Sequence, residues 1–232
     1  MTQYDALLSS FSKTVFTVFD TETTGLDPKS NRVVEIGGIR FDSRGIVSRF
    51  SVLINPKVPM PPEVTKINGI TDAMLAGQSE SKTVLPDFMR FIGNTVLIAH
   101  NAPFDVNFIN EDLSRLALPP LTNKVIDTRL FAKEVFPDLP KYALQELALR
   151  FGIEAKDAHR AEDDARVCME LFLVCMKKLR EKNPHFTEEA PAPSSPAPET
   201  ARTSKQDESA YSDDLFSNEG ESEEDLFEQS LD

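Results

Sequence analysis

The pattern of apolar and polar positions divides the chain into strand-like and helix-like segments. Thr14–Asp20 is rich in β-branched and aromatic residues, which is typical of a strand. The same criterion predicts further strands at Arg32–Asp42, Ile46–Ile54, Thr95–His100 and Val125–Asp127. A turn around Ser43–Gly45 indicates that the second and third strands form a hairpin.

Helical spacing of apolar residues alternates with the later strands. After a Pro-rich loop at Asn55–Pro62, helices are predicted at Ser81–Ile92, from Asn101 to about Leu116, and at Thr128–Val135, Lys141–Phe151 and Ala161–Glu181. Pro86 is expected to disturb the first of these helices, and Asn101 is expected to cap the second. Strands followed by alternating helices and short buried strands predict an α/β fold, with a mixed sheet flanked by helices.

The last part of the chain has a different composition from the rest. Residues 1–186 hold 23 Lys and Arg against 24 Asp and Glu, whereas residues 187–232 hold 2 against 14. Ala190–Ala201 is rich in Pro, Ala and Ser, and the residues after it are acidic with few apolar side chains. We therefore expect one folded domain at 1–186, followed by a linker and a disordered acidic C-terminal tail at 187–232.

The near-neutral charge of residues 1–186 argues against a tight, non-specific DNA binder. It is compatible with an enzyme that holds only a strand end, where metal ions supply positive charge. Cys168 and Cys175 lie seven residues apart in one apolar helical pattern, so we expect reduced core residues. No signal-peptide pattern and no apolar run of membrane-spanning length is found, and we expect a cytoplasmic protein without a membrane partner.

Several carboxylates stand where metal chemistry is possible, although each has a simpler interpretation. Asp20 and Glu22 are two residues apart on a strand, so they share one face as metal ligands or as a solvated strand end. Asp105 falls in the first turn of a helix, where the helix dipole alone favours an acid. Asp164 borders the apolar stripe of the last helix, whereas Asp163 is expected to face solvent.

One histidine completes this candidate set. His159 lies in the loop before the last helix, where a histidine is either a surface residue or a catalytic base. Four carboxylates offer only oxygen ligands, which Mg²⁺ and Mn²⁺ prefer. Two such ions can stabilise both the attacking and the leaving oxygen of a phosphodiester.

Five motifs in this order resemble the DEDDh exonuclease family. They are F-D-T-E-T-T-G-L (Phe19–Leu26), V-E-I-G (Val34–Gly37), I-N-G-I-T (Ile67–Thr71), A-H-N-A-P-F-D (Ala99–Asp105) and H-R-A-E-D-D (His159–Asp164). The resemblance covers roughly Lys13–Leu179. Within the family, it is closest to the epsilon-type proofreading exonucleases of bacterial DNA polymerase III and to the exonuclease domains of PolC-type polymerases.

The resemblance implies a ribonuclease H-like fold and a role for each matching residue. Asp20, Glu22, Asp105 and Asp164 match the acids that bind two Mg²⁺ or Mn²⁺ ions, and His159 matches the general base. By the same resemblance, Thr23, Leu26 and Asn101 are expected to contact the terminal nucleotide, and Asp127 to have a structural role. Asn68 departs from the family pattern, because some epsilon subunits have histidine there.

The implied function is 3′→5′ hydrolysis at a single-stranded or frayed DNA 3′ end, releasing nucleoside 5′-monophosphates in replication proofreading. No polymerase sequence follows, so the domain is expected to act alone or with a polymerase catalytic subunit. Two alternatives stay open: trimming of RNA or small oligonucleotides, as in ribonuclease T-like relatives, and a non-catalytic subunit that bridges polymerase partners. In the tail, Leu215-Phe216 and Leu226-Phe227 are candidate anchors for a sliding clamp or polymerase.

Overall fold

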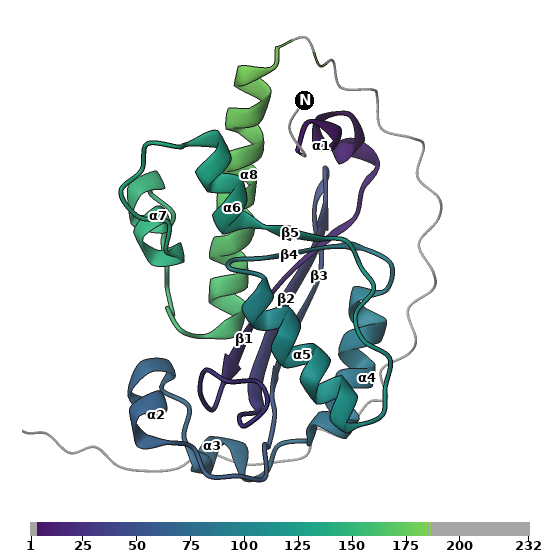
Figure 1. The fold of residues 1–232 in the computed structure, drawn as a ribbon, viewed down its shortest axis with the longest axis vertical. Coiled ribbons are helices and arrows are strands. Elements are labelled where there is room, and N and C mark those ends of the chain that lie inside the picture. Colours follow the sequence, from purple (N-terminus) through teal and green to yellow (C-terminus); the bar gives the residue numbers. More distant parts are fainter. Residues whose placement is uncertain (1–3, 185, 187–232) are drawn as a thin grey trace, which may run out of the picture. The chain divides into compact units, whose positions relative to one another are not determined.

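A five-stranded mixed sheet forms the centre of the domain (Figure 1). The computed structural model describes residues 4–184 and 186. The strands lie in the order β3-β2-β1-β4-β5. Strand β1 pairs antiparallel with β2, which pairs antiparallel with β3, while β4 and β5 run parallel to β1. Their bounds are β1 Phe16–Thr23, β2 Val33–Asp42, β3 Gly45–Leu53, β4 Val96–Ala99 and β5 Val125–Asp127.

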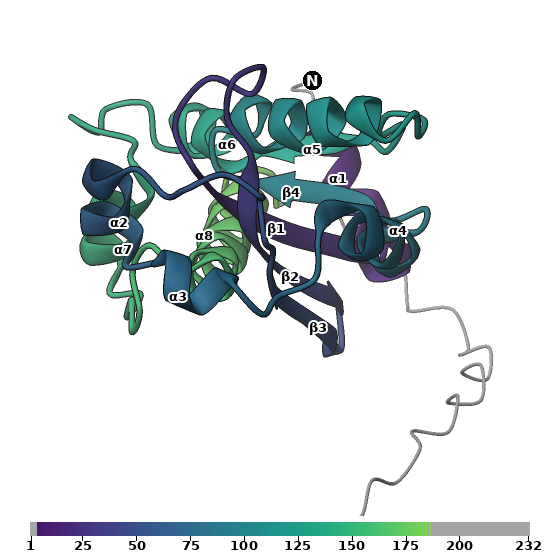
Figure 2. The ribbon, with the colours of Figure 1, turned by 90° about the horizontal axis from the view of Figure 1, so that it is seen from below.

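Helices cover both faces of this sheet, as expected from the sequence. On one face, α4 (Ser81–Ile92) and α5 (Pro103–Arg115) enclose one core cluster. On the other face, α6 (Thr128–Val135), α7 (Leu144–Phe151) and α8 (Ala161–Lys182) enclose a second cluster. Figure 2 shows strands β1 and β2 between α8 and α4.

The alternation of side chains along β1 explains how apolar and acidic residues share one strand. Phe16 and Val18 point toward α8, and the Phe16 and Phe172 rings lie 5.3 Å apart. Phe19 points to the opposite face and packs on Phe88. Asp20 continues the row of Phe16 and Val18, so the strand directs its first acid toward α8.

The N-terminal end of α8 lies unusually close to β2. A Cβ atom on Gly37 would be 2.1 Å from the backbone carbonyl carbon of Ala161. No other residue type fits there without moving the helix, because real Cβ contacts are longer than this. Gly37 thus lets the first turn of α8, which carries Asp164, approach the sheet.

Four expectations about individual elements differ from the structure. Strand β1 extends to Thr23 rather than ending at Asp20, and α7 begins at Leu144 rather than Lys141. Helix α4 continues through Pro86, since buried side chains such as Leu85 and Phe88 hold the helix on the sheet. Asn101 is not a helix cap, because the N-cap of α5 is Ala102 and no side chain bonds there.

Short helices were not anticipated by the sequence pattern. They are α1 (Asp5–Ser10), the 3₁₀ turn Phe11–Lys13, α2 (Pro62–Asn68) and α3 (Asp72–Leu75). Near α2 and α3, four buried residues form a small separate core: Val34, Met60, Ile70 and Leu75. The prediction that Cys168 and Cys175 are core residues is confirmed, because both are free and buried.

The described residues belong to one compact unit, Met1–Pro193. The predicted boundary after residue 186 and the predicted disordered tail lie outside the described residues and stay predictions. Among helices formed by residues 4–184 and 186, none has the length and apolar character to span a membrane.

Candidate active site

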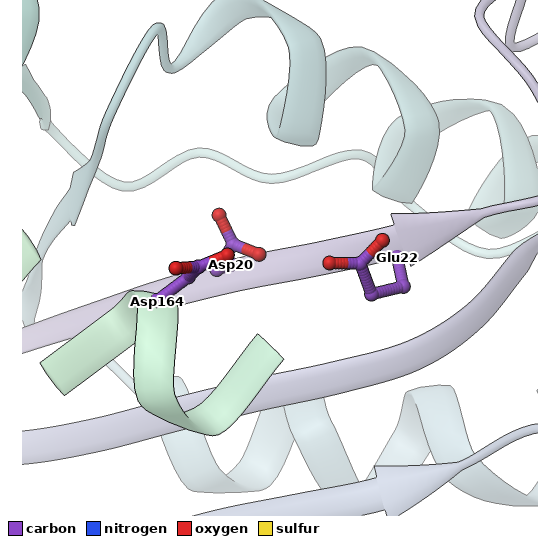
Figure 3. A group of neighbouring side chains, drawn as sticks. All are labelled: Asp20, Glu22 and Asp164. Carbon is purple, nitrogen blue, oxygen red and sulfur yellow. The ribbon is translucent and has the colours of Figure 1, made fainter. Parts of the chain in front are cut away.

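Three of the predicted carboxylates meet at the carboxyl-terminal end of β1. Asp20 and Glu22 come from this strand, and Asp164 comes from the first turn of α8 (Figure 3). One oxygen atom from each residue lies within 4.8 Å of the others. The structure therefore brings together acids that are more than 140 residues apart in the sequence.

The surroundings of these acids disfavour negative charge. Burial and the nearby carboxylates raise the pKa of Asp20 well above its usual value. Burial raises the pKa of Glu22 to about 8, and the neighbouring Asn68 side chain opposes this rise. Burial also raises the pKa of Asp164. Among the described residues, no lysine or arginine forms an ion pair with these three acids, so a bound cation would relieve their repulsion.

Asp105 lies in the same pocket but outside the three-acid group. It is buried in the first turn of α5, as predicted. Its Oδ1 atom accepts hydrogen bonds from the Thr21 backbone N–H at 3.0 Å and the Thr21 hydroxyl at 2.7 Å. Burial raises the pKa of Asp105 to about 7, and these two bonds oppose the rise.

His159 lies beside Asp164 in the loop before α8. Its backbone N–H donates to Asp164 Oδ2 at 3.1 Å, while Gln145 of α7 donates to Asp164 Oδ1 at 2.7 Å. His159 adopts a left-handed conformation with φ 65° and has an exposed side chain. A non-glycine residue held in this conformation depends on its surroundings for support.

These residues line a pocket of about 310 Å³. Its walls contain all four predicted acids and the predicted base, together with neighbours from β1, α5 and α7. The lining residues are Asp20, Thr21, Glu22, His100, Asn101, Phe104, Asp105, Ala143, Leu144, Gln145, His159 and Asp164. The pocket lies beyond the carboxyl ends of the parallel strands β1 and β4, where ligands bind in open α/β sheets.

The expectation that Asp163 faces solvent is wrong. Its side chain is only 11% exposed. Asp163 Oδ2 accepts from the backbone N–H groups of Lys156 at 2.7 Å and Asp157 at 2.9 Å, and Arg166 pairs with Oδ1. An acid in the first turn of a helix can bind nearby free N–H groups, and here it orders the loop that leads to His159.

The structure assigns supporting contacts to Asp127 and His100. As expected of a structural residue, Asp127 accepts from the backbone N–H groups of Asn101 and Ala102 and also caps α6. His100 has its Nδ1 atom 2.9 Å from the Thr128 hydroxyl, and its Nε2 atom is 2.9 Å from the Tyr142 carbonyl. Burial lowers the pKa of His100, which favours a neutral ring.

The three residues expected to contact the substrate lie in different surroundings. Leu26 is 84% exposed, in the loop that follows β1. Asn101 lines the pocket, and its side-chain oxygen accepts from Arg129. Thr23 is buried, and its hydroxyl donates to the Gly25 carbonyl. Their contacts with a nucleotide stay predictions.

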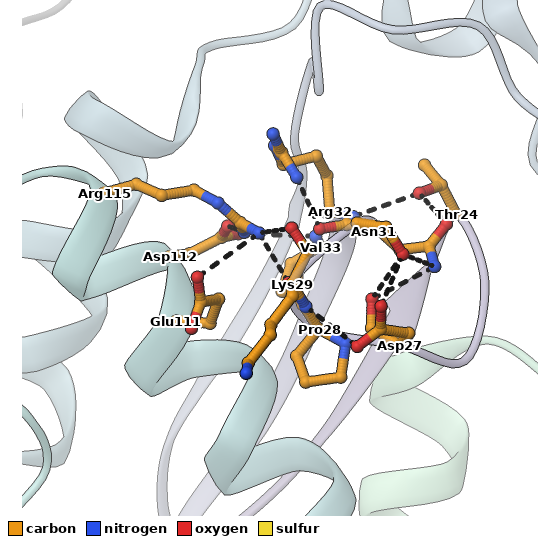
Figure 4. Close-up of polar contacts among 11 residues, drawn as sticks. Thr24, Asp27, Pro28, Lys29, Asn31, Arg32, Val33, Glu111, Asp112 and Arg115 are labelled. Atoms are coloured by element: carbon orange, nitrogen blue, oxygen red, sulfur yellow. Dashed lines mark hydrogen bonds and ion pairs between the residues drawn. The ribbon is translucent and has the colours of Figure 1, made fainter.

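A polar network fixes the loop that carries Leu26 (Figure 4). Arg115 of α5 donates to the backbone carbonyls of Pro28 and Lys29 and pairs with the buried Asp112. Asp112 in turn accepts from the Val33 backbone N–H at 3.4 Å. Helix α5 therefore carries Asp105 at one end and holds the Leu26 loop at the other.

Several residues that hold the site together were not predicted from the sequence. Thr21 and Gln145 bind the acids directly, and Glu35 binds Arg160 and Ala161 beside His159. Glu35 had a recognisable signal, because an acid between Val34 and Ile36 interrupts an otherwise apolar strand. Thr21 and Gln145 had none, since polar residues are ordinary at such positions.

Comparison with known families defines the class of protein. Residues 17–172 match the RNase_T family, described as exonuclease, and this match covers more than half of the chain. The chain belongs to this exonuclease family. Its curated relatives include the DNA polymerase III subunit epsilon of Treponema pallidum (strain Nichols), which is 49% identical over 82% of this chain and 89% of the relative. The epsilon subunit of Aquifex aeolicus (strain VF5) is 35% identical over 71% of this chain and 81% of the relative.

Longer polymerases and solved exonuclease structures are also similar. The PolC-type DNA polymerase III of Clostridium perfringens (strain 13 / Type A) is 41% identical over 72% of this chain, but over only 12% of the relative. Exonuclease X in complex with 5′ overhanging duplex DNA is 28% identical, with a TM-score of 0.58 over 70% of this chain and 91% of that chain. A structure of exonuclease I is 20% identical with a TM-score of 0.64, covering 75% and 42% of the two chains, which supports the fold alone. The expected ribonuclease H-like fold and exonuclease family are thus confirmed.

Proposed function

We propose that this chain is a metal-dependent 3′→5′ exonuclease that removes nucleotides from DNA 3′ ends, as a proofreading subunit of DNA polymerase III. The observation that carries this proposal is the pocket in which Asp20, Glu22 and Asp164 cluster beside Asp105 and His159. Its support from relatives is 49% identity to an epsilon subunit over 89% of that subunit. Replication in the cytoplasm is the matching cellular setting.

The four acids are the proposed ligands of two Mg²⁺ or Mn²⁺ ions. Oxygen is the only donor type that they offer, and small hard divalent cations prefer oxygen. Burial, followed by the charge of nearby carboxylates, raises the pKa values of Asp20 and Glu22, and among the described residues no lysine or arginine forms an ion pair with them. When bound, the two ions lower the pKa of an attacking water and stabilise the charge on the leaving 3′ oxygen.

His159 is the proposed general base. Its exposed side chain lines the pocket, and the bond from its backbone N–H to Asp164 places it beside the acids. The imidazole accepts the proton of the attacking water, which needs a neutral ring. His100 is unsuited to this role, because both of its ring nitrogens are within bonding distance of Thr128 and Tyr142.

The pocket is proposed to hold the terminal nucleotide, with Leu26, Asn101 and Thr23 as contacts. Exposed Leu26 offers an apolar surface for a base or sugar, and Asn101 offers an amide at the pocket wall. Trimming of RNA or small oligonucleotides would use the same acids and the same base. The 2′-hydroxyl is the group by which a protein distinguishes these substrates.

The test compares 5′-labelled single-stranded DNA, RNA of the same sequence, and a primer with a mispaired 3′ end, each with Mn²⁺. We expect stepwise shortening of DNA and of the mispaired primer, and slower shortening of RNA. Asp20→Asn should abolish activity, because the substitution removes a proposed ligand charge. Asp87→Asn is the matched control, since Asp87 is exposed on α4 and pairs only with Arg90 on its own helix. Equal activity of Asp20→Asn and the unmodified protein would contradict the proposed site.

A further inference from the structure

Glu35 is a buried carboxylate near the proposed metal site, in addition to the four predicted ligands. It lies on β2 directly opposite Glu22 of β1 in the antiparallel register. Its side chain is only 2% exposed, and its charge raises the pKa of both Asp20 and Glu22. Despite this proximity, the three-acid group formed by Asp20, Glu22 and Asp164 does not include it. A buried acid beside other acids requires a compensating partner.

Arg160 is that partner. Its Nη2 atom donates to Glu35 Oε1 at 2.7 Å, and its Nε atom donates to Oε2 at 3.1 Å. The two parallel bonds form a bidentate pair, which fixes orientation as well as charge. The Ala161 backbone N–H adds a third bond to Oε2 at 3.1 Å. Both Glu35 oxygens are therefore directed at the start of α8.

The residues that donate to Glu35 stand directly between His159 and Asp164 in the sequence. Arg160 directly follows His159 and is the N-cap residue of α8, and Ala161 is the first residue of the helix. Asp164 lies three residues later and binds back to the His159 backbone N–H. The same end of α8 packs closely on β2 at Gly37, where there is no room for a Cβ atom. Glu35 thus anchors the segment that carries both the proposed base and one proposed ligand.

We propose that Glu35 is a positioning residue, which acts through Arg160 and Ala161 to hold His159 in its left-handed backbone conformation beside Asp164. This inference rests on the proposed function. It assigns Glu35 no contact with the metal ions or the DNA. Displacing a catalytic base by about 1 Å can cost ~10²-fold in rate, so loss of the anchor should slow turnover strongly.

The experiment uses the full chain with Glu35→Gln, Arg160→Gln and the corresponding double variant. Glu162→Gln is the matched control. Glu162 also links the start of α8 to the sheet, through an ion pair with Arg49 at 3.0 Å, but its side chain is 37% exposed, against 2% for Glu35. The measurements are kcat and KM on 5′-labelled single-stranded DNA, the pH–rate profile, Mn²⁺ affinity and Tm.

We expect ~10²-fold loss of kcat in each single variant, with KM and Mn²⁺ affinity within about twofold of the unmodified protein. The double variant should be no slower than either single variant, because both remove one interaction. The acidic limb of the pH–rate profile should weaken, since the base is misplaced. Arg160→Lys keeps the charge but offers a single nitrogen in place of the bidentate guanidinium, and it should recover part of the rate. Glu162→Gln should behave like the unmodified protein.

Three results would overturn the inference. Unchanged kcat in Glu35→Gln would remove the positioning role. A loss of Mn²⁺ affinity comparable to that of Asp20→Asn would make Glu35 a ligand instead. A rate loss that follows Tm, with an unchanged pH–rate profile in the folded fraction, would show a purely structural role. If Glu35→Gln does not fold, kcat, the pH–rate profile and Mn²⁺ affinity of Arg160→Lys and Arg160→Gln test the positioning role instead. An inactive unmodified protein would contradict the proposed function itself, which separates the two failures.

Discussion

At the scale of single residues, the site is a group of acids kept close together in partly buried positions. Folding brings one carboxylate oxygen each of Asp20, Glu22 and Asp164 within 4.8 Å of the others. A hydrogen bond from the Thr21 hydroxyl holds Asp105 nearby. Such a group destabilises the metal-free fold when it is ionised. The same repulsion makes the pocket a strong attractor for divalent cations.

The stability of the metal-free protein should therefore fall as the pH rises. Folding raises the pKa of Glu22 from 4.5 to about 8 and that of Asp105 from 3.8 to about 7. A raised acid pKa means that the folded state binds more protons between the two values, so stability is full below the unfolded value and is lost as pH rises through the folded value. Tm measured in a chelator from pH 4 to pH 9 should decline over this window (about 4 to 8).

Mn²⁺ should remove this decline, because it binds the ionised acids and its affinity rises with pH. The gain in Tm on adding Mn²⁺ should therefore be larger at about pH 8 than at about pH 6. Glu22→Gln should flatten the metal-free curve. A Tm in chelator that rises through the same window would contradict the assignment of these pKa shifts.

Turnover should depend on His159, whereas binding of Mn²⁺ and of DNA should not. His159→Ala removes the proposed base, and general-base catalysis typically contributes about 10²–10⁴-fold in rate. Mn²⁺ affinity and KM for single-stranded DNA should stay near those of the unmodified protein. The acidic limb of the pH–rate profile should disappear in this variant but persist in His100→Gln, whose ring has a structural position. An acidic limb that persists in His159→Ala at saturating Mn²⁺ would assign the base elsewhere.

At the scale of elements, helix α5 links the proposed metal site to the loop that carries Leu26. Arg115 should matter for substrate binding through its bonds to Pro28 and Lys29. Arg115→Ala frees this loop and leaves buried Asp112 without its ion pair, which typically costs about 1–3 kcal/mol. We expect a higher KM with little change in kcat, together with a lower urea midpoint.

Glu111→Gln provides the control for this loop prediction, because Glu111 is 3.7 Å from Arg115 and more exposed than Asp112. Its KM and urea midpoint should stay near those of the unmodified protein. A normal KM in Arg115→Ala would show that the loop does not contribute to DNA binding.

The contact between β2 and α8 predicts a strong effect at Gly37. Gly37→Ala would place a Cβ atom 2.1 Å from the Ala161 backbone, so the start of α8 must move. Overpacking of this kind typically costs about 1–3 kcal/mol, and the movement should also reduce kcat, because it displaces Asp164. Gly77→Ala is the control, since nothing lies within 4 Å of its added Cβ. Urea denaturation and kcat on single-stranded DNA measure both effects.

The elements that the sequence predicted are those with a long or regular apolar pattern. Each of the five strands was placed by its β-branched and aromatic residues, and α8 by its apolar stripe. Helices α2 and α3 were not predicted, because they have only seven and four residues. At these lengths tertiary contacts rather than intrinsic propensity decide whether a helix forms.

Within the site, the acids were predictable because motif spacing and strand alternation mark them. Their supporting residues were not. The bond from Thr21 to Asp105 spans 84 positions, and the bond from Ala161 to Glu35 spans 126. Such pairs have no local signal, since only the folded sheet brings them together. The solvent-facing orientation expected of Asp163 was wrong for a different reason. Its partners Lys156 and Asp157 are close in the sequence, but they lie in an irregular loop that helical periodicity does not describe.

At the scale of the whole molecule, most of the net negative charge lies beyond residue 186. Residues 187–232 hold 14 of the 38 acidic residues and 2 of the 25 basic ones. Electrostatic attraction to DNA should therefore come from residues 1–186 and the proposed metal ions rather than from residues 187–232. We propose that residues 187–232 bind protein partners, with Leu215-Phe216 and Leu226-Phe227 as the anchors.

Removing the tail should separate hydrolysis from association. A protein without residues 187–232, and one with both Leu-Phe pairs changed to Ala-Ala, should hydrolyse free single-stranded DNA at the unmodified rate. Both should lose association with the sliding clamp or polymerase in pull-downs, because the apolar anchors are gone. Equal recovery of those partners without the tail would exclude the anchoring role.

The length of helix α8 also makes it possible to place a fluorescent label at a known distance from the pocket. It starts beside the acids and continues to Lys182, so position 181 lies about 26 Å along the helix from Asp164 at 1.5 Å per residue. Glu181 is exposed, and the two native cysteines, Cys168 and Cys175, are buried. A fluorophore attached through Glu181→Cys would thus react at one site and remain remote from the chemistry. Energy transfer to a dye near the DNA 3′ terminus would then report arrival and release of the strand in real time.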